Sequence, residues 1–162
     1  MTHFDDAGHP RMVDVTGKPI TPRTATAEAI VTMQPETLAM MTSGESKKGD
    51  VLAVARLAAI QAAKHTSLMI PLCHAIPVEG VEVSFEFPDT SSVRCTAKVH
   101  TTARTGVEME ALLAVSIAGL TIYDMCKSVD RKIEVTSIRL LNKSGGASGH
   151  FVRDQAPRPS SG

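Results

Sequence analysis

Residues 106–127 read G-V-E-M-E-A-L-L-A-V-S-I-A-G-L-T-I-Y-D-M-C-K, with two glutamates at the start and an aspartate and a lysine at the end. The middle of this run, from Ala111 to Tyr123, holds thirteen uncharged residues and no proline, which predicts a helix rather than a strand. The uncharged part is too short to span a membrane, which needs about 20 apolar residues. A helix that is apolar on all sides must be buried on all sides. We therefore expect this helix to pack on its own sheet and, on its other side, on another subunit.

The composition of the chain narrows its class. With 162 residues, a single domain is the simplest arrangement. The 17 basic and 17 acidic residues give a formal net charge of zero, which does not favour nucleic acid or an anionic membrane as a partner. Only 3% of the residues are aromatic, so stacking on bases is not expected. Cys73, Cys95 and Cys126 form no paired motif, and the first residues lack a secretory signal, so we expect a reducing, cytoplasmic setting.

Local patterns predict the other elements. Strands are expected at Ala25–Met33, Val81–Phe87, Val93–Val99 and Ile133–Leu141, and helices at 35–41 and Val51–Lys64. Gly44 ends the first of these helices, and Asp50 is a good N-cap for the second. Loops are expected at Thr16–Thr26 and at the glycine-rich Lys143–Gly149, and prolines predict irregular backbone around residues 71–77.

The order strand, short helix, long helix, strand, strand, helix, strand is typical of an α+β, ferredoxin-like βαββαβ fold. We expect an antiparallel sheet with helices on one face. The other face of the sheet then needs cover, which again predicts association between subunits. Residues 12–151 are predicted to form the single domain, with a flexible N-terminus at residues 1–11 and a flexible C-terminal tail at residues 152–162.

Charged residues gather at the ends of the central helix, and each pair has a purely structural explanation. Asp124 and Lys127 are three apart and so are neighbours on the helix surface. They form either an ordinary surface ion pair or a carboxylate beside an active lysine, whose pKa burial can lower. Glu108 and Glu110 lie at the positive end of the helix dipole, which alone explains them. On spacing alone, the structural explanations are favoured.

The remaining motifs also stay open. The K-K-G-D run at 47–50 precedes a helix N-terminus, where a phosphate could bind, but it lacks the P-loop pattern and equally fits a solvated loop. Cys73-His74 has no further ligands at zinc spacing, so a buried thiol beside a hydrogen-bonding histidine explains it better than a metal. The K-S-G-G run at 143–146 fits either an anion-binding loop or a simple turn.

Taken together, several motifs carry a family resemblance. They are M-V-D-V (12–15), K-G-D-V (48–51), I-Q-A-A-K (60–64), P-L-C-H (71–74), T-G-V-E-M-E-A-L (105–112), L-T-I-Y-D-M-C-K (120–127) and K-S-G-G (143–146). In this order they resemble the cyclic pyranopterin monophosphate synthase family, the accessory protein C of molybdenum cofactor biosynthesis. The resemblance runs from about Met12 to Phe151.

The resemblance implies an enzyme, a phosphorus–oxygen lyase, that completes the first step of molybdenum cofactor synthesis. Its substrate would be a 3′,8-cyclised dihydro-GTP made by a radical S-adenosylmethionine partner enzyme. Its products would be cyclic pyranopterin monophosphate and diphosphate. No cofactor is implied, although Mg²⁺ is compatible with the triphosphate. The resemblance also implies a homohexamer, built as a trimer of dimers, with active sites at subunit interfaces.

Matched position by position, the resemblance also implies residue roles. Asp124 matches a catalytic aspartate, and Lys127 and Lys48 match two essential lysines. We expect the two lysines to act as acid and base groups, with Asp124 orienting or tuning Lys127. The substrate-binding positions are Leu72, Cys73, His74, Glu108, Met109 and Glu110, and the basic positions suited to the triphosphate are Arg23, Lys64 and Lys143.

The chain departs from the family pattern at two positions. Arg11 precedes M-V-D-V where members often carry histidine, and Ala75 follows P-L-C-H where proline is usual. Neither change removes a proposed catalytic group. Two alternatives stay open: a non-catalytic ferredoxin-like module that binds a nucleotide or pterin, and a purely structural oligomer. The first needs the lysines but not Asp124, and the second needs only the apolar helix.

Overall fold

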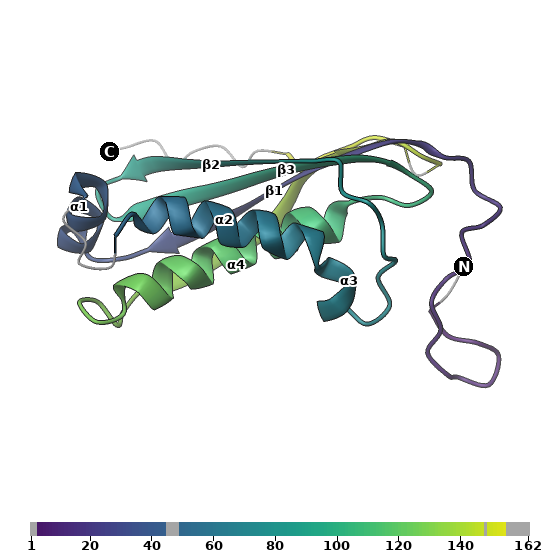
Figure 1. The fold of residues 1–162 in the computed structure, drawn as a ribbon, viewed down its shortest axis with the longest axis horizontal. Helices are drawn as coiled ribbons and strands as arrows, with labels where there is room; N and C mark the ends of the chain where they lie inside the picture. The colour runs from purple at the N-terminus through teal and green to yellow at the C-terminus, as the bar shows by residue number, and fades with distance from the viewer. Residues whose placement is uncertain (1–2, 45–48, 148, 155–162) are drawn as a thin grey trace.

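The computed structural model describes residues 3–44, 49–147 and 149–154 of the chain. In chain order its elements are β1 (Thr21–Thr32), α1 (Pro35–Ser43), α2 (Val51–Lys64), α3 (Thr66–Met69), β2 (Gly80–Asp89), β3 (Ser92–Ala103), α4 (Glu108–Cys126), β4 (Glu134–Ser144) and β5 (Phe151–Val152). The strands form one antiparallel sheet in the order β2-β3-β1-β4-β5. α2 and α4 lie side by side on one face of it (Figure 1). This is the predicted α+β architecture, consistent with the ferredoxin-like pattern.

The contact between α4 and the central strand β1 forms the middle of the core. Ala25, Ala27 and Ala29 of β1 are fully buried on the helix side of the sheet. Gly119 of α4 lies so close to the sheet that a Cβ atom there would be 2.8 Å from Cγ1 of Val135 in β4. Small residues on both elements therefore let the helix approach the sheet closely, and the packing leaves no room for larger ones.

Local signals in the sequence located several boundaries correctly. The Asp50 carboxylate accepts the backbone N–H of Ala53 at 2.9 Å and caps α2. Gly44 ends α1 with a left-handed φ of 77°. β2 and β3 form the predicted hairpin, with Val83 buried on the helix side. Residues 70–79 form neither helix nor strand apart from turns, as the prolines predicted.

β1 begins at Thr21, so the prediction of a loop through Thr26 is wrong. Pro22 caused the error, because proline lacks the N–H that a central strand needs. In the structure Pro22 pairs with Thr102 of β3, whereas pairing with β4 starts only at Thr24. The proline therefore lies outside the part of β1 that is paired on both sides.

β4 is also longer than predicted. It continues through Lys143 and Ser144, which pair with β1, so the glycine-rich loop begins only at Gly145. The register of β4 against β1 shifts twice, and Ser137 has a φ of 53° at one of these irregularities. Such β-bulges depend on the partner strand and have no reliable signal in the strand's own sequence.

The two ends of the chain make local contacts. Near the N-terminus, the Asp5 carboxylate accepts the backbone N–H groups of Ala7 and His9 at 2.9 and 2.8 Å. At the other end, β5 pairs with β4 through Phe151 and Val152. The flexibility of residues 1–11 and 152–162 stays a prediction.

α4 is confirmed as the central helix. With 19 residues it is long and apolar enough, by length and composition, to cross a membrane, so the argument that the run is too short does not hold. Half of its most apolar window is buried inside the chain, against the sheet and α2, as in a core helix. Its outer side is not covered within one chain, because Leu120 is 56% exposed. The predicted contact with a second subunit would cover that side.

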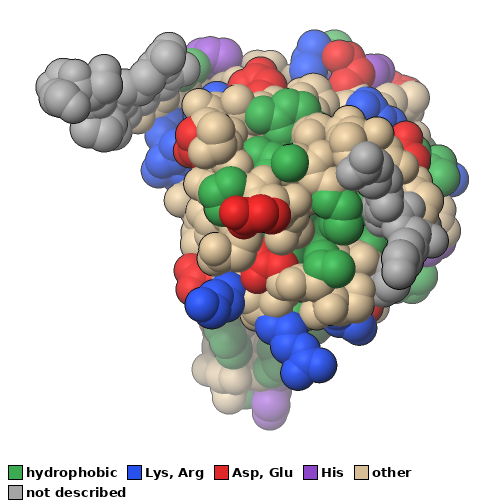
Figure 2. Space-filling view, turned by 90° about the vertical axis from the view of Figure 1, so that its left-hand side faces the viewer, with side chains coloured by type: hydrophobic (Ala, Val, Ile, Leu, Met, Phe, Trp, Pro, Cys, Tyr) green, Lys and Arg blue, Asp and Glu red, His purple; other side chains and the backbone are tan. Residues whose placement is uncertain are grey.

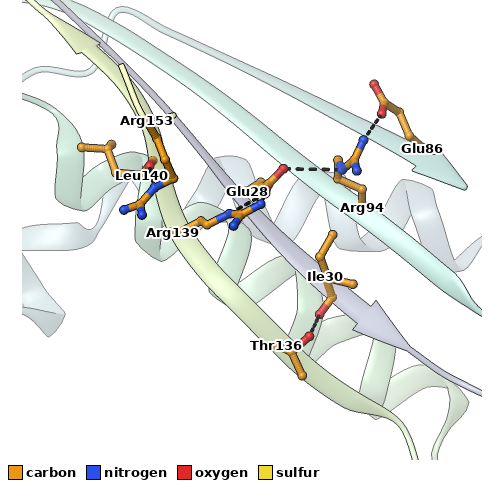
Figure 3. Close-up of polar contacts among 8 residues, drawn as sticks. All are labelled: Glu28, Ile30, Glu86, Arg94, Thr136, Arg139, Leu140 and Arg153. Carbon is orange, nitrogen blue, oxygen red and sulfur yellow. Dashed lines mark hydrogen bonds and ion pairs between the residues drawn. The ribbon is translucent and has the colours of Figure 1, made fainter. Parts of the chain in front are cut away.

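The open face of the sheet is polar. Glu28 of β1 is only 5% exposed, although it lies on this face, because arginines from both neighbouring strands reach it (Figure 3). Arg139 Nη2 lies 2.6 Å from Glu28 Oε1, and Arg94 Nε lies 3.5 Å from Glu28 Oε2. Arg94 also pairs with Glu86 of β2 at 3.0 Å. These ion pairs link four strands and bury the Glu28 carboxylate within one chain. That another subunit covers this face stays a prediction.

Glu28→Gln should destabilise the protein by about 2 kcal/mol, because two arginines lose a buried carboxylate partner. The free energy of unfolding in urea measures the effect. Glu86→Gln is a matched control in the same network, and its side chain is 61% exposed, so it should cost less than about 0.5 kcal/mol. Equal losses for the two variants would contradict a buried role for Glu28.

Candidate active site

The predicted site residues lie at two opposite ends of α4. A rise of about 1.5 Å per residue places Asp124 about 24 Å along the helix axis from Glu108. α2 runs beside α4 in the opposite direction, so each end of the helix layer combines the start of one helix with the end of the other (Figure 1). We call the two groups the Glu108 end and the Lys127 end. The Glu108 end comprises Arg23, Lys64, Leu72, Cys73, His74, Glu108, Met109, Glu110 and Lys143, and the Lys127 end comprises Asp124 and Lys127.

A pocket of about 550 Å³ opens at the Glu108 end. Of the predicted substrate-binding residues, it is lined by Leu72, Cys73, His74, Glu108 and Met109. The N-terminal segment forms another wall through Val13 and Lys18. His74 holds this wall in place, because its Nε2 donates a hydrogen bond to the Val13 carbonyl at 2.7 Å. The volume is that of a typical small-molecule site.

Glu110 is a buried acid behind this pocket. It is 2% exposed, and its Oε1 accepts a hydrogen bond from Cys73 Sγ at 3.8 Å. Its Oε2 has no hydrogen-bond partner among the described residues. Burial raises the pKa of this carboxyl. Glu110 therefore places a buried carboxyl oxygen, Oε2, that could accept a further hydrogen bond next to the pocket residue Cys73.

Glu108 joins the start of α4 to the end of β4. Its Oε1 accepts a hydrogen bond from Lys143 Nζ at 2.7 Å, and both side chains are about three-quarters buried. Gly106 makes room for the carboxylate, because a Cβ there would lie 1.9 Å from Glu108 Oε2. The family resemblance implied that Lys143 binds the triphosphate. In the structure its ammonium group forms an ion pair with Glu108 of the same chain.

The other two basic positions at this end differ in exposure. Arg23 is 7% exposed, and its guanidinium donates to the carbonyls of Ala103 at 3.3 Å and Arg104 at 3.2 Å. A Cβ on Gly146 would lie 1.6 Å from Arg23 Nη1, so the glycine loop closes over the guanidinium. Arg23 thus holds backbone segments together in the single chain. Lys64 is exposed at the C-terminus of α2.

At the Lys127 end, an ion pair follows the apolar part of α4. Lys127 Nζ donates to Asp124 Oδ1 at 2.5 Å, and the two side chains are 51% and 65% exposed. The hydrogen bond that Lys127 donates to the Asp124 carboxylate raises the pKa of Lys127. This is the opposite of the burial-lowered pKa considered from the sequence. Lys127 therefore carries a positive charge at neutral pH in the single chain.

A second pocket of about 470 Å³ lies beside this ion pair, lined by Tyr123, Lys127, Ser128 and Arg131. Figure 2 faces this end of the molecule and shows Lys and Arg side chains gathered in its lower part, where α4 ends. The Lys127 end is therefore basic and open in the single chain.

Lys48, the second predicted catalytic lysine, lies outside the described residues. Its neighbours Gly49 and Asp50 precede α2, whose start lies at the same end of the helix layer as Lys127 (Figure 1). The structure therefore brings together the predicted substrate-binding residues at one end and separates them from Asp124 and Lys127 at the other.

Sequence reasoning missed some of the pocket residues. Val13, Val15 and Lys18 line the larger pocket, although the M-V-D-V motif was used only for the family resemblance and no site residue was predicted in it. Apolar residues within a polar N-terminal segment were the available signal. Among the described residues, no group of three or more His, Cys, Asp or Glu side chains is placed to hold a metal ion.

Cys73 should react slowly with iodoacetamide. Burial, together with the charges of Glu110 and Glu108, raises the pKa of its thiol from 9.0 to about 11, so alkylation at pH 8 should be about 100-fold slower than for an unperturbed thiol. The rate measured against pH should keep rising up to about pH 11. Glu110→Gln removes part of the repulsion and should shift the curve to lower pH. A half-maximal rate below pH 9 in the unmodified protein would contradict the assignment.

Known proteins resemble this chain along nearly its whole length. A family model described as MoaC family matches residues 12–146. A cyclic pyranopterin monophosphate synthase of Magnetococcus marinus is 56% identical over 98% of this chain and 98% of the relative. Proteins of the same name are 52% identical in Desulfitobacterium hafniense, over 95% of this chain and 94% of the relative, and 53% identical in Rhodopirellula baltica, over 94% and 93%.

Proposed function

This chain belongs to the MoaC family, and we propose from this premise that it is a cyclic pyranopterin monophosphate synthase of molybdenum cofactor biosynthesis. The observation that carries the proposal is the match over nearly the full length to relatives of that name. The protein is then an enzyme, and the lyase class fits the name. The two alternatives from the sequence, a regulatory binding module and a structural oligomer, have no comparable support.

For the reaction, we propose the substrate that the family resemblance implies, a 3′,8-cyclised dihydro-GTP made by a radical S-adenosylmethionine enzyme. Its imidazole ring opens and the pterin ring forms. A ribose oxygen then attacks the α-phosphorus, so that a new O–P bond forms, the hydroxyl proton leaves, and the bond to diphosphate breaks. These steps need proton transfer and anion stabilisation, which lysines and carboxylates supply.

Residue roles follow from the two ends of α4. The pocket at the Glu108 end has the volume and polar walls for the nucleotide part of the substrate. We propose that Lys127, whose amine is held by the hydrogen bond to Asp124 Oδ1, donates a proton or stabilises the developing anion, with Asp124 orienting it. Lys48 is then the candidate base. We propose no resident cofactor, and Mg²⁺ would bind mostly through phosphate oxygens of the substrate.

The distance between the two ends supports a shared site. A substrate in the pocket at the Glu108 end is too far from Lys127 of the same chain for direct proton transfer, because the helix separates them by about 24 Å. A second chain that supplies its own Lys127 end would complete the site. Exposed apolar side chains on the helix layer, such as Leu57 (68% exposed) and Leu120 (56%), favour such contacts. We propose a homohexamer, a trimer of dimers, with active sites at subunit interfaces.

The expected cellular setting and partners rest mainly on the composition of the chain. We propose a cytoplasmic enzyme with a small-molecule substrate and with neither nucleic acid nor membrane as a partner. The zero net charge and the burial of α4 within the fold support this proposal.

Asp124→Asn and Lys127→Ala should each lower the rate of diphosphate release by about 100-fold to 10,000-fold, because each removes part of the proton-transfer pair. The assay uses cyclised dihydro-GTP made with the partner enzyme. Light scattering should show an unchanged oligomer.

Lys98→Ala is a matched control, because Lys98 is also half-exposed (50%) and pairs with Glu82 at 3.7 Å, but lies on the open face of the sheet. It should keep its rate within about twofold of the unmodified enzyme. Normal turnover by both site variants would overturn the catalytic assignment. Substrate binding without diphosphate release by the unmodified protein would instead favour the binding-module alternative.

A further inference from the structure

Asp130 lies shortly after Lys127, and its carboxylate joins two separate segments. The residue is only 5% exposed. Its Oδ2 accepts the backbone N–H of Gln34 at 2.8 Å and the hydroxyl of Thr37 at 3.2 Å. Its Oδ1 accepts the backbone N–H of Lys132 at 2.9 Å. The carboxylate therefore bonds both to the start of α1 and to its own turn.

The start of α1 lacks a cap of its own. Gln34 occupies the N-cap position and makes no hydrogen bond with its side chain, and Pro35 follows it in the first turn. The N-terminus of a helix carries unpaired N–H groups and a partial positive charge, which an anion stabilises. Asp130 supplies that anion from a segment more than 90 residues away in the sequence.

Backbone hydrogen bonds hold the segment between Lys127 and Asp130 against the end of α4. The backbone N–H of Lys127 donates to the carbonyl of Tyr123 at 2.8 Å, which continues the helix by one residue. The N–H groups of Val129 and Asp130 both donate to the carbonyl of Cys126, at 2.9 and 3.1 Å. Cys126 itself is fully buried. Residues 127–130 are therefore wound onto the end of α4, and a contact that holds Asp130 also holds Lys127.

We propose that Asp130 is a positioning residue, whose carboxylate ties the end of α4 to the start of α1 and so fixes the backbone of Lys127 for proton transfer. The inference rests on the proposed function, in which Lys127 donates a proton. A buried carboxylate is costly unless it is well hydrogen-bonded. The hydrogen bond from Gln34 lowers the pKa of Asp130, so the carboxylate stays charged at neutral pH.

Asp130→Ala tests the proposal. It should lower kcat by about 10- to 100-fold, because a misplacement of about 1 Å costs up to about 100-fold, while KM changes by less than about threefold. Amide hydrogen exchange should become faster at Gln34 and at residues 127–130. Asp130→Asn keeps one oxygen acceptor and should recover part of kcat. Because unfolded protein in a sample also lowers the apparent kcat at constant KM, kcat is normalised to the concentration of folded protein. Faster exchange confined to Gln34 and residues 127–130 then distinguishes positioning from a general loss of folded protein.

Asp89→Ala is the matched control. The Asp89 carboxylate accepts the backbone N–H of Ser91 at 2.8 Å in the turn between β2 and β3, so its loss also weakens a turn but does not reach Lys127. Its kcat should be unchanged. If Asp130→Ala does not fold, Thr37→Val removes a single bond to the same carboxylate and should lower kcat by a few-fold.

The proposal is overturned if kcat of Asp130→Ala, or of Thr37→Val in its place, stays within twofold of the unmodified enzyme, or falls no further than in Asp89→Ala. Hydrogen exchange separates this result from failure of the proposed function. If the unmodified protein does not turn over cyclised dihydro-GTP, the proposed function fails. Faster exchange at residues 127–130 in the variant would then still support the tether, and unchanged exchange would overturn it.

Discussion

The close approach of α4 to β1 is the contact on which the rest of the molecule depends. A Cβ on Gly119 of the helix would lie 2.8 Å from Cγ1 of Val135 in β4 and 3.4 Å from Cγ2 of Val31 in β1, and the alanines of β1 that face the helix are fully buried. The helix also packs against β3, β4 and α2, so several elements hold it in place. Its 19 continuous residues place Glu108 and Asp124 about 24 Å apart along the helix axis.

This distance limits which of the predicted site residues can act together within one chain. One end of α4 contributes to a pocket with a buried acid, Glu110, and the other end carries a protonated lysine, Lys127, on an exposed surface. In the proposed function neither end is a complete site within one chain, because the proposed substrate pocket and the proposed catalytic pair lie at opposite ends of α4. An interface that places the Lys127 end of one subunit against the Glu108 end of another would bring the two groups of predicted site residues together. It would also cover the outer side of α4, which the sequence predicted to be buried.

Features that depend on residues close together in the sequence, such as helix ends and the hairpin, were predicted correctly. Asp50 and Gly44 mark helix ends, and alternation in β2 and β3 marks the hairpin, because each signal acts over a few residues. Long-range contacts escaped prediction. The enclosure of Arg23 involves carbonyls about 80 residues away, and Asp130 reaches α1 across more than 90. The resemblance correctly identified the family, but it assigned Arg23 and Lys143 to the triphosphate without showing that other groups of the same chain already engage them.

The central claim is that each active site combines ends from two subunits, and mixed oligomers test it most directly. His74→Ala, at the Glu108 end, and Lys127→Ala should each be inactive alone. When the two variants are co-expressed and assembled at random, about one quarter of the sites should combine two intact ends, so diphosphate release should return to about one quarter of the unmodified rate. If each site lay within one chain, the mixture would stay as inactive as either variant, and the account would be wrong.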